Sequence, residues 1–271
     1  MKYKKFFIVS IVTIICILLC RKFYAYYSPA QEREIYYTIQ HNDDTLRIAF
    51  IGDSWAFGHQ HHYCLIPQML SENLQRPVIV ESYGIGGLTS KEIYHALFEI
   101  DTFKNFIIKG YDYCIISAGI NDTNKKMSIS YYKNSINCII RFMHENHIHP
   151  ILLEIPDYNI LQTYNNHKFY EKTVRRLSMI INSKDIDCKQ EFREALNDLI
   201  NENRYEDQVS IIRYRTWNNN YTKDLETLYI DDQVHLNERG YQKLDSVVTN
   251  IISKHYLREK RQKVQHSLYN K

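Results

Sequence analysis

Short apolar runs alternate with amphipathic segments along most of the chain. The apolar runs are typical of buried strands, and they occupy residues 46–51, 78–82, 113–117, 151–155 and 209–214. Segments with helical spacing of apolar residues lie at 64–74, 91–103, 129–146, 168–182, 191–203 and 238–256. Apolar strands separated by helices indicate a parallel sheet covered on both faces. The pattern therefore predicts an α/β fold, a three-layer α/β/α sandwich with a mostly parallel sheet of about five strands.

An uncharged hydrophobic segment precedes this pattern. Residues 6–20 (FFIVSIVTIICILLC) contain no charge, and basic residues flank them on both sides. The segment is short for a membrane span, but the aromatic residues that follow can extend it at the membrane interface. A signal-peptidase site ending at Ala25 would need a small residue two positions earlier, where Phe23 stands. The bulky residue before Cys20 argues against a lipoprotein signal. We expect residues 1–27 to be an uncleaved membrane-anchor helix, with the domain exported to the periplasmic or extracellular side. A cleaved or lipidated form is the alternative.

The rest of the chain divides into three parts. Residues 28–45 form a polar linker suited to holding a domain off a membrane, residues 46–256 carry the alternating pattern, and residues 257–271 form a basic tail. The tail is expected to be a solvated helix end, with contact to anionic lipid as the alternative. No strongly apolar insertion resembling a lid interrupts the pattern. One domain of catalytic size is the simplest interpretation.

The formal net charge of +3 is unevenly distributed along the 271 residues. Residues 1–22 and residues 254–271 each carry +5, which leaves −7 on residues 23–253. An acidic body offers no broad cationic face for phosphates, and this argues against a nucleic-acid partner. Two basic ends fit better beside anionic lipid, so we expect a membrane partner through the N-terminal segment.

The six cysteines follow neither a zinc pattern nor a disulfide framework. Two belong to the hydrophobic segment, and the others are scattered without a CxxC pair, at Cys64, Cys114, Cys138 and Cys188. Cys114 lies inside an apolar run and is expected to be a small buried side chain. The sequence does not decide whether two of these four cysteines form a disulfide.

Polar motifs follow the predicted strands. They are GDSW at residues 52–55, YGIGG at 83–87 and GIND at 119–122, and DQVH at 232–235 stands before the last helix. Ligands of open parallel sheets bind beyond the carboxyl ends of the strands, so these motifs are the candidates for chemistry. Each motif alone is a common turn or helix cap. Their joint occurrence at successive strand ends favours a shared site.

In this order the motifs resemble those of the SGNH (GDSL-type) hydrolase family, over residues 46–241. The family's four named residues would be Ser54, a glycine of the second motif, Asn121 and His235. The resemblance implies a flavodoxin-like sandwich and hydrolysis of esters or thioesters, sometimes acyl transfer, with no metal or organic cofactor. Trp55 stands where many members have Leu, a departure that the family tolerates.

The residue types also indicate this chemistry directly. A serine hydroxyl is a weak nucleophile and needs a base, which His235 can supply to Ser54 once the fold brings them together. Asp232, one helical turn before His235, can accept the other ring N–H and hold the imidazole in the required tautomer. Asp231 is the alternative to Asp232. The predicted catalytic residues are therefore Ser54, Asp232 and His235.

Acyl transfer builds negative charge on the carbonyl oxygen, and this charge needs fixed hydrogen-bond donors. The candidates for this oxyanion hole are the N–H groups of Ser54 and Gly87 and the side-chain amide of Asn121. Gly87 is chosen because Gly-Gly-Leu-Thr-Ser matches the ending Gly-x-Thr-Ser that is usual in the family. Gly86 and Gly84 are the alternatives.

Neighbouring residues have simpler interpretations. Asp53 and Asp122 are expected to hydrogen-bond to loop backbone and not to act as acids or bases. The histidines of GHQHHY lack acidic or cysteine partners at ligand spacing, so they are expected on the cleft rim and not around a metal, at His59, His61 and His62. Trp55 and Phe57 can pack under the first helix or form a platform for an acyl group or sugar.

Together these features predict a serine esterase of the cell envelope that removes, or transfers, a small acyl group such as acetyl on a surface glycan. Its expected partners are an acylated small molecule or glycan and the membrane. A lysophospholipase or thioesterase acting on longer chains is one alternative. A catalytically silent glycan-binding or assembly protein is another. The sequence makes no prediction of the oligomeric state.

Overall fold

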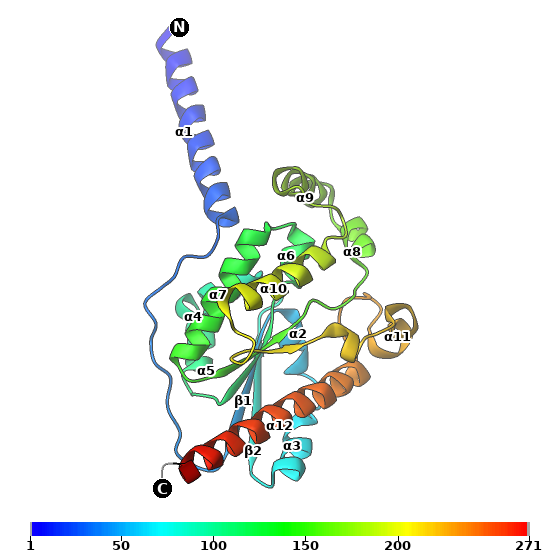
Figure 1. The fold of residues 1–271 in the computed structure, drawn as a ribbon. Helices are drawn as coiled ribbons and strands as arrows, with labels where there is room; N and C mark the ends of the chain where they lie inside the picture. Colours follow the sequence, from blue (N-terminus) through cyan, green and yellow to red (C-terminus); the bar gives the residue numbers. More distant parts are fainter. Residues whose placement is uncertain (1, 270–271) are drawn as a thin grey trace.

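The computed structural model describes the backbone of residues 2–269 (Figure 1). It also describes the side chains of this range except those of residues 2–10, 12, 15, 19, 22 and 266–269.

A five-stranded parallel sheet forms the centre of the domain. Its strands are β1 (Leu46–Gly52), β2 (Val78–Gly84), β3 (Tyr113–Ser117), β4 (His149–Leu153) and β5 (Ser210–Ile212). They lie in the order β2-β1-β3-β4-β5, and every neighbouring pair is parallel. This is the strand order of flavodoxin-like sheets. The predicted three-layer fold and its parallel sheet are confirmed, and β5 is shorter than expected.

Helices cover both faces of the sheet (Figure 1). One layer contains α5, α4, α7 and α10, in which each helix contacts the next in this order. The other layer contains α3 and α12, which contact each other. The helices before β4 are α1 (Lys2–Tyr27), α2 (Ser54–His59), α3 (Ile66–Leu74), α4 (Ser90–Glu99), α5 (Asp101–Ile107), α6 (Ile120–Lys125) and α7 (Ile129–Glu145). Those after β4 are α8 (Ile160–Asn166), α9 (Phe169–Asn182), α10 (Lys189–Asn203), the 3-10 helix η1 (Tyr214–Thr216), α11 (Tyr221–Leu228) and α12 (Glu238–Tyr269).

Two predicted helices differ from the structure by more than a residue or two at one end. The segment 91–103 divides into α4 and α5 at Ile100, whose backbone is extended with φ −105° and ψ 107°. Helix α12 continues to Tyr269, well past residue 256, because residues 257–269 contain no Gly or Pro and many good helix formers. The predicted basic tail is thus mostly the end of a long helix.

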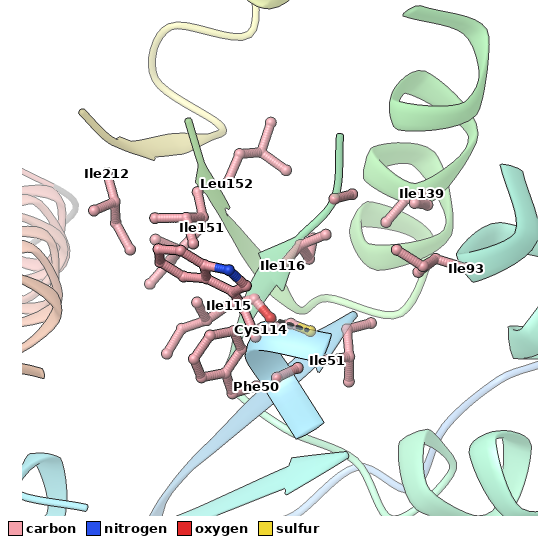
Figure 2. Packing of buried hydrophobic residues seen from close by; sticks show 14 of the residues in the cluster. Phe50, Ile51, Ile93, Cys114, Ile115, Ile116, Ile139, Ile151, Leu152 and Ile212 are labelled. Carbon is pink, nitrogen blue, oxygen red and sulfur yellow. Dashed lines mark hydrogen bonds between the residues drawn. The ribbon is translucent and has the colours of Figure 1, made fainter. Parts of the chain in front are cut away.

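The core lies between the sheet and its two helix layers. Figure 2 shows Phe50 of β1, Ile115 of β3 and Ile151 of β4 packed together, and all three are fully or almost fully buried. Burial of such aliphatic and aromatic side chains is the main stabilising contribution to the fold. Cys114 is buried as expected, and all six cysteines are free thiols.

The linker 28–45 has no helix or strand, as predicted, but it lies against the domain. The hydroxyl of Tyr36 donates to the carbonyl of Leu97 at 2.6 Å, and the N–H of Thr38 donates to Oδ1 of Asn146 at 2.7 Å. Thr38 is buried. This segment is therefore attached to the helix layer of α4 and α7 and is not a free spacer. The division of the chain at residues 27, 45 and 256 stays a prediction.

The segment expected to anchor the protein forms helix α1, which projects from the domain (Figure 1). Within the described part of the chain, no helix combines the length and the apolar character needed to cross a membrane. The side chains of residues 2–10, 12, 15, 19 and 22, which belong to the predicted anchor, lie outside the described residues.

Candidate active site

A tight turn between β1 and α2 presents Ser54. Gly52 has φ +146°, and a Cβ at this position would lie 2.1 Å from the carbonyl oxygen of Ser117, so the turn requires glycine. Asp53 caps α2 by accepting the N–H of Trp55 at 3.0 Å. As a result, Ser54 occupies the first turn of α2 at the carboxyl end of the sheet.

His235 and Asp232 reach Ser54 from the loop before α12. Nε2 of His235 lies 2.7 Å from Oγ of Ser54, and Nδ1 lies 2.5 Å from Oδ2 of Asp232. Because the carboxylate accepts the Nδ1 proton, Nε2 is free to accept the serine proton. The structure thus brings the three predicted catalytic residues into one hydrogen-bonded chain, and Asp232, not Asp231, holds the ring.

Asp232 is fixed by hydrogen bonds on both oxygens. Its Oδ1 accepts the N–H groups of Val234 and His235, both at 2.9 Å. Partial burial would raise the pKa of Asp232, but the hydrogen bonds from the His235 ring and from the two backbone N–H groups outweigh burial and hold this pKa below its usual value. The carboxylate is therefore ionised and oriented toward the imidazole at neutral pH.

The glycine motif after β2 borders the serine. Gly86 and Gly87 line the same cleft as Ser54 and Asn121. Gly84 has a different role, because a Cβ there would lie 2.2 Å from the nitrogen of Phe57. Close packing of β2 on α2 explains this glycine. Because Gly86 and Gly87 both line the cleft, the backbone N–H of either can reach the oxyanion, and the choice of Gly87 stays a prediction.

Asn121 lies in the first turn of α6, beyond the end of β3. Its side-chain nitrogen donates to the carbonyl of Leu88 at 2.9 Å, which ties α6 to the loop that carries Gly86 and Gly87. This nitrogen carries two hydrogens, and one of them makes this contact. Lys125, at the end of the same helix, donates to the carbonyl of Gly87 at 2.9 Å. These contacts hold the glycine loop beside the serine.

Asp53 and Asp122 are buried and hydrogen-bonded to their surroundings. Asp53 accepts the hydroxyl of Ser117 at 2.8 Å, and Asp122 accepts the N–H and the hydroxyl of Ser90 at 2.8 and 2.6 Å. Burial raises the pKa of each carboxyl to about 6, although these hydrogen bonds oppose the shift. Their partners are those of structural residues, in agreement with the sequence interpretation.

The three histidines of GHQHHY occupy different environments. His59 is buried, so its predicted place on the cleft rim is wrong; its ring contacts Asp245 at 2.8 Å and Ser82 at 2.7 Å. His62 binds Glu238 at 2.8 Å, and His61 packs edge-on against the exposed ring of Phe57. The rule that buried polar groups need partners explains the position of His59.

Among the described residues, the group best placed to ligate a metal is His59, Cys64 and Asp245, whose ligand atoms lie within 4.8 Å of one another. Both ring nitrogens of His59 already have hydrogen-bond partners. Burial raises the pKa of the Cys64 thiol to about 12. The contacts of this cluster are therefore those of a packed polar core.

Of the two roles considered for Trp55 and Phe57, packing in the core applies to Trp55, and a surface for a ligand stays open for Phe57. Trp55 is fully buried with its ring 5.6 Å from that of Trp217, so it packs beneath the site. Phe57 is exposed beside His61 and remains available to a ligand.

The cleft at the triad has a volume of about 440 Å³; most of the residues that line it are polar, but the surface they expose in it is mainly apolar. Sequence reasoning missed part of its wall, which comes from α6, from α8 and from the residues just before and after α8: Asn124, Tyr158, Thr163, Asn166 and His167. Only Asn124 had a usable signal, since it lies one helical turn after Asn121. Helix α9, which the pattern predicted, follows this wall and exposes apolar side chains.

Comparisons with known proteins agree with this geometry. The sequence model of the GDSL-like lipase/acylhydrolase family matches residues 50–243. The fold is similar to that of the lipase/acylhydrolase from Enterococcus faecalis, at 14% identity and a TM-score of 0.51, covering 77% of this chain and 96% of that chain. It is also similar to a mutant of an acetyl-xylooligosaccharide esterase from Geobacillus stearmophilus, at 16% identity and a TM-score of 0.51, covering 76% and 94%. No curated protein matches the sequence.

Proposed function

Because this chain belongs to the GDSL-like lipase/acylhydrolase family and is a carboxylic ester hydrolase, we propose that it removes, or transfers, a small acyl group such as acetyl on a surface glycan. The observation that carries this proposal is the hydrogen-bonded chain of Ser54, His235 and Asp232 in an open cleft. Hydrogen-bonded Ser, His and Asp side chains of this kind activate the serine for attack on a carbonyl carbon.

The first half of the reaction acylates Ser54. Its Oγ forms a bond to the ester carbonyl carbon while its proton passes to Nε2 of His235. The tetrahedral intermediate then collapses, the bond to the alcohol oxygen breaks, and His235 returns the proton to the departing alcohol. Asp232 stabilises the imidazolium through the bond from Nδ1.

The second half removes the acyl group. Water, or the hydroxyl of an acceptor sugar, gives its proton to His235 and attacks the acyl-enzyme, and Ser54 leaves with the proton returned. In both halves the oxyanion receives hydrogen bonds from the N–H of Ser54, the N–H of Gly87 and the amide of Asn121. Gly86 is the alternative backbone donor, because it lines the same cleft. Each such donor typically contributes about 3–4 kcal/mol to transition-state stabilisation.

The polar side chains that line the cleft support a polar acceptor. Amide, hydroxyl and imidazole groups from Asn124, Thr163 and His167 border the serine, and these groups hydrogen-bond well to sugar hydroxyls. One structural neighbour is an esterase of acetyl-xylooligosaccharides, a substrate of the same kind. A lipid-like substrate is the second candidate, since the apolar surface of α9 begins where the cleft wall ends.

The proposed place of work is the cell envelope. The uncharged segment 6–20 with basic flanks is the feature that favours attachment to a membrane, with the domain on the exported side. A reporter fused to the C-terminus that is active in only one compartment tests this placement. A reporter active in the cytoplasm would contradict it.

Substrate profiling tests the proposed activity. The purified full chain should hydrolyse p-nitrophenyl acetate faster than octanoyl and longer esters, and it should release acetate from an acetylated polysaccharide. Ser54→Ala is the control for contaminating esterases. Faster turnover of long chains would favour the lysophospholipase or thioesterase alternative, and no turnover of any ester by the folded protein would favour the silent binding protein.

A further inference from the structure

Helix α9 has its apolar side chains on the outside. In most surface helices the apolar face is turned toward the core and the polar face toward water. Here the only buried residue of the helix is Ser178. Six of its exposed side chains are aromatic or aliphatic and share one face of the helix, the apolar arc, with the exposed Thr173 among them and the exposed Arg176 at their edge: Phe169, Tyr170, Val174, Leu177, Ile180 and Ile181.

Hydrogen bonds from the polar face fix this orientation. Arg175 donates through Nε to the carbonyl of Asn124 at 3.2 Å, and Asn182 donates to the carbonyl of Lys126 at 2.7 Å. Ser178 shares a hydrogen bond of 2.6 Å with the hydroxyl of Tyr27. Contacts in the middle and at the end of the helix therefore hold its polar side on the domain. The apolar arc is consequently a built surface, and a contiguous exposed apolar patch marks an interaction site.

The end of helix α1 extends this surface. A groove of about 540 Å³ lies between the last turn of α1 and α9, with Phe23, Tyr26 and Val174 in its walls. Phe23 and Tyr26 are exposed. Figure 1 shows α1 and α9 at the same end of the domain, near α6, while α3 and the far end of α12 lie at the opposite end. The apolar surface is therefore confined to one end of the molecule.

This surface is continuous with the active-site cleft. His167, in the turn that leads into α9, lines the cleft, and Lys125 lines the groove while donating to the carbonyl of Gly87. A partner that covers α9 would therefore lie directly beside the proposed oxyanion loop.

The charge of α9 indicates what this partner is. Residues 168–182 contain four basic side chains and one acidic side chain, Glu171; Arg175 is bonded to the domain, whereas Lys168 and Arg176 are exposed and Lys172 is half-buried. A basic helix with an aromatic and aliphatic face is typical of helices that lie in the interface of an anionic bilayer. Two copies of the same basic face would repel each other in a symmetric dimer, which argues against a second copy of this chain.

We propose that α9, together with the last turn of α1, docks on an anionic lipid surface and holds the catalytic cleft at the head-group layer. Ester groups carried by lipids or by lipid-linked glycans then reach Ser54 without leaving the membrane. This inference goes beyond the proposed hydrolysis, because docking does not depend on which acyl group is removed.

Tryptophan fluorescence of the full chain tests the docking surface. The two native tryptophans, Trp55 and Trp217, are buried and give a constant background. Tyr170→Trp places a reporter in the centre of the arc, and Tyr37→Trp is the matched control on the linker, since these tyrosines are 63% and 73% exposed. Each variant is mixed with vesicles of phosphatidylcholine and phosphatidylglycerol that contain brominated phosphatidylcholine as a quencher.

The expected result is a blue shift and a loss of about half of the added emission for Tyr170→Trp, with little change for Tyr37→Trp. Adding Leu177→Glu and Ile181→Glu to Tyr170→Trp should abolish the quenching, even if α1 still retains the protein on the vesicles. Unquenched emission from Tyr170→Trp on vesicle-bound protein would overturn the proposal, as would equal quenching of both reporters. A blue shift without vesicles that grows with protein concentration would also overturn it, in favour of self-association.

Discussion

Among the residues whose side chains the structure describes, two Ser–His–Asp chains stand out, and the first of them borders a cleft. The first joins Ser54, His235 and Asp232 with contacts of 2.7 and 2.5 Å. The second joins Ser82, His59 and Asp245 with contacts of 2.7 and 2.8 Å. The ring is reversed in the second chain, since Nδ1 of His59 faces the serine and Nε2 faces the aspartate. The distances alone do not separate a catalytic site from a structural one.

Exposure and neighbouring donors separate them. The side chains of His235 and Asp232 are 34% and 42% exposed, whereas those of His59 and Asp245 are 2% and 1% exposed. Ser54 also faces Asn121 and the glycine loop. The buried chain instead joins α2, β2 and α12, the three elements that carry its members. The same three residue types thus perform acyl chemistry where a carbonyl can enter, and stabilise the fold where it cannot.

The largest expected difference between the two chains is the effect of removing each serine. Ser54→Ala should lower kcat for p-nitrophenyl acetate by about 10⁶-fold, because no other group can accept the acyl group. Ser82→Ala removes one hydrogen bond and should leave kcat within about twofold while lowering the free energy of unfolding by about 1 kcal/mol. Steady-state kinetics and urea denaturation measure the two effects. Similar kcat values for both variants would contradict the distinction between a catalytic and a structural Ser–His–Asp chain.

Removing each aspartate is the next test. Asp232→Ala should lower kcat by about 10⁴-fold with little change in stability. Without its carboxylate partner, the imidazole is no longer held in the tautomer that accepts the serine proton. Asp245→Ala leaves the ring of His59 buried without its carboxylate and should lower the free energy of unfolding by about 3–5 kcal/mol. The Asp245→Ala protein that is folded at low temperature should retain kcat. A stable but inactive Asp245→Ala protein would contradict this assignment.

The oxyanion donors distinguish the exposed chain further. Asn121→Ala should lower kcat by about 10²–10³-fold with little change in KM, since its hydrogen bond strengthens only when negative charge develops. The matched control is Asn124→Ala, an amide in the same helix and cleft, whose effect should be mainly on KM. An unchanged kcat in Asn121→Ala would remove this residue from the oxyanion hole.

The smallest expected effect concerns Asp53, next to the nucleophile. Its pKa is raised by burial to about 6, so the native state binds more protons than the unfolded state between about pH 4 and 6, and stability falls as pH rises through this window. Asp53→Asn can keep both hydrogen bonds that reach Oδ1 and removes the charge.

The expected result for Asp53→Asn is a stability that depends less on pH, with a gain over the wild type that grows by about 2–3 kcal/mol between about pH 4 and 7. Urea denaturation at both pH values measures this gain. Asp231→Asn, at an exposed neighbour of the triad, is the control and should follow the wild type. A gain that is the same at both pH values would show that Asp53 is not the titrating group.

The sequence was sufficient for the first chain because Ser54 stands in a motif at a strand end, and Asp232 and His235 stand in a motif before the last helix. Ser54 and Asn121 each follow an apolar strand, and parallel strands bring their carboxyl ends to one edge. The second chain could not be predicted, because Ser82 lies within β2 and Asp245 within α12, where no motif marks them. Their contact with His59 depends on how α12 packs, which local patterns do not encode.

Helix α9 illustrates a different limit. Its apolar periodicity predicted the helix nearly to the residue, as Phe169–Asn182. Periodicity gives the apolar face but not the direction in which that face points. The usual rule would turn Leu177 and Ile181 inward, whereas Arg175 and Ser178 hold the helix the other way round. The direction became known only from hydrogen bonds between distant parts of the chain.

Covalent trapping tests the central assignment most directly. A fluorophosphonate forms a bond between phosphorus and an activated serine oxygen and releases fluoride, so it labels a serine only where a base accepts the hydroxyl proton. Mass spectrometry of the digested, folded full chain should find one adduct, on Ser54, and none in His235→Ala. An adduct on Ser82, or none on the folded protein, would contradict the assignment of Ser54, His235 and Asp232 as the catalytic chain.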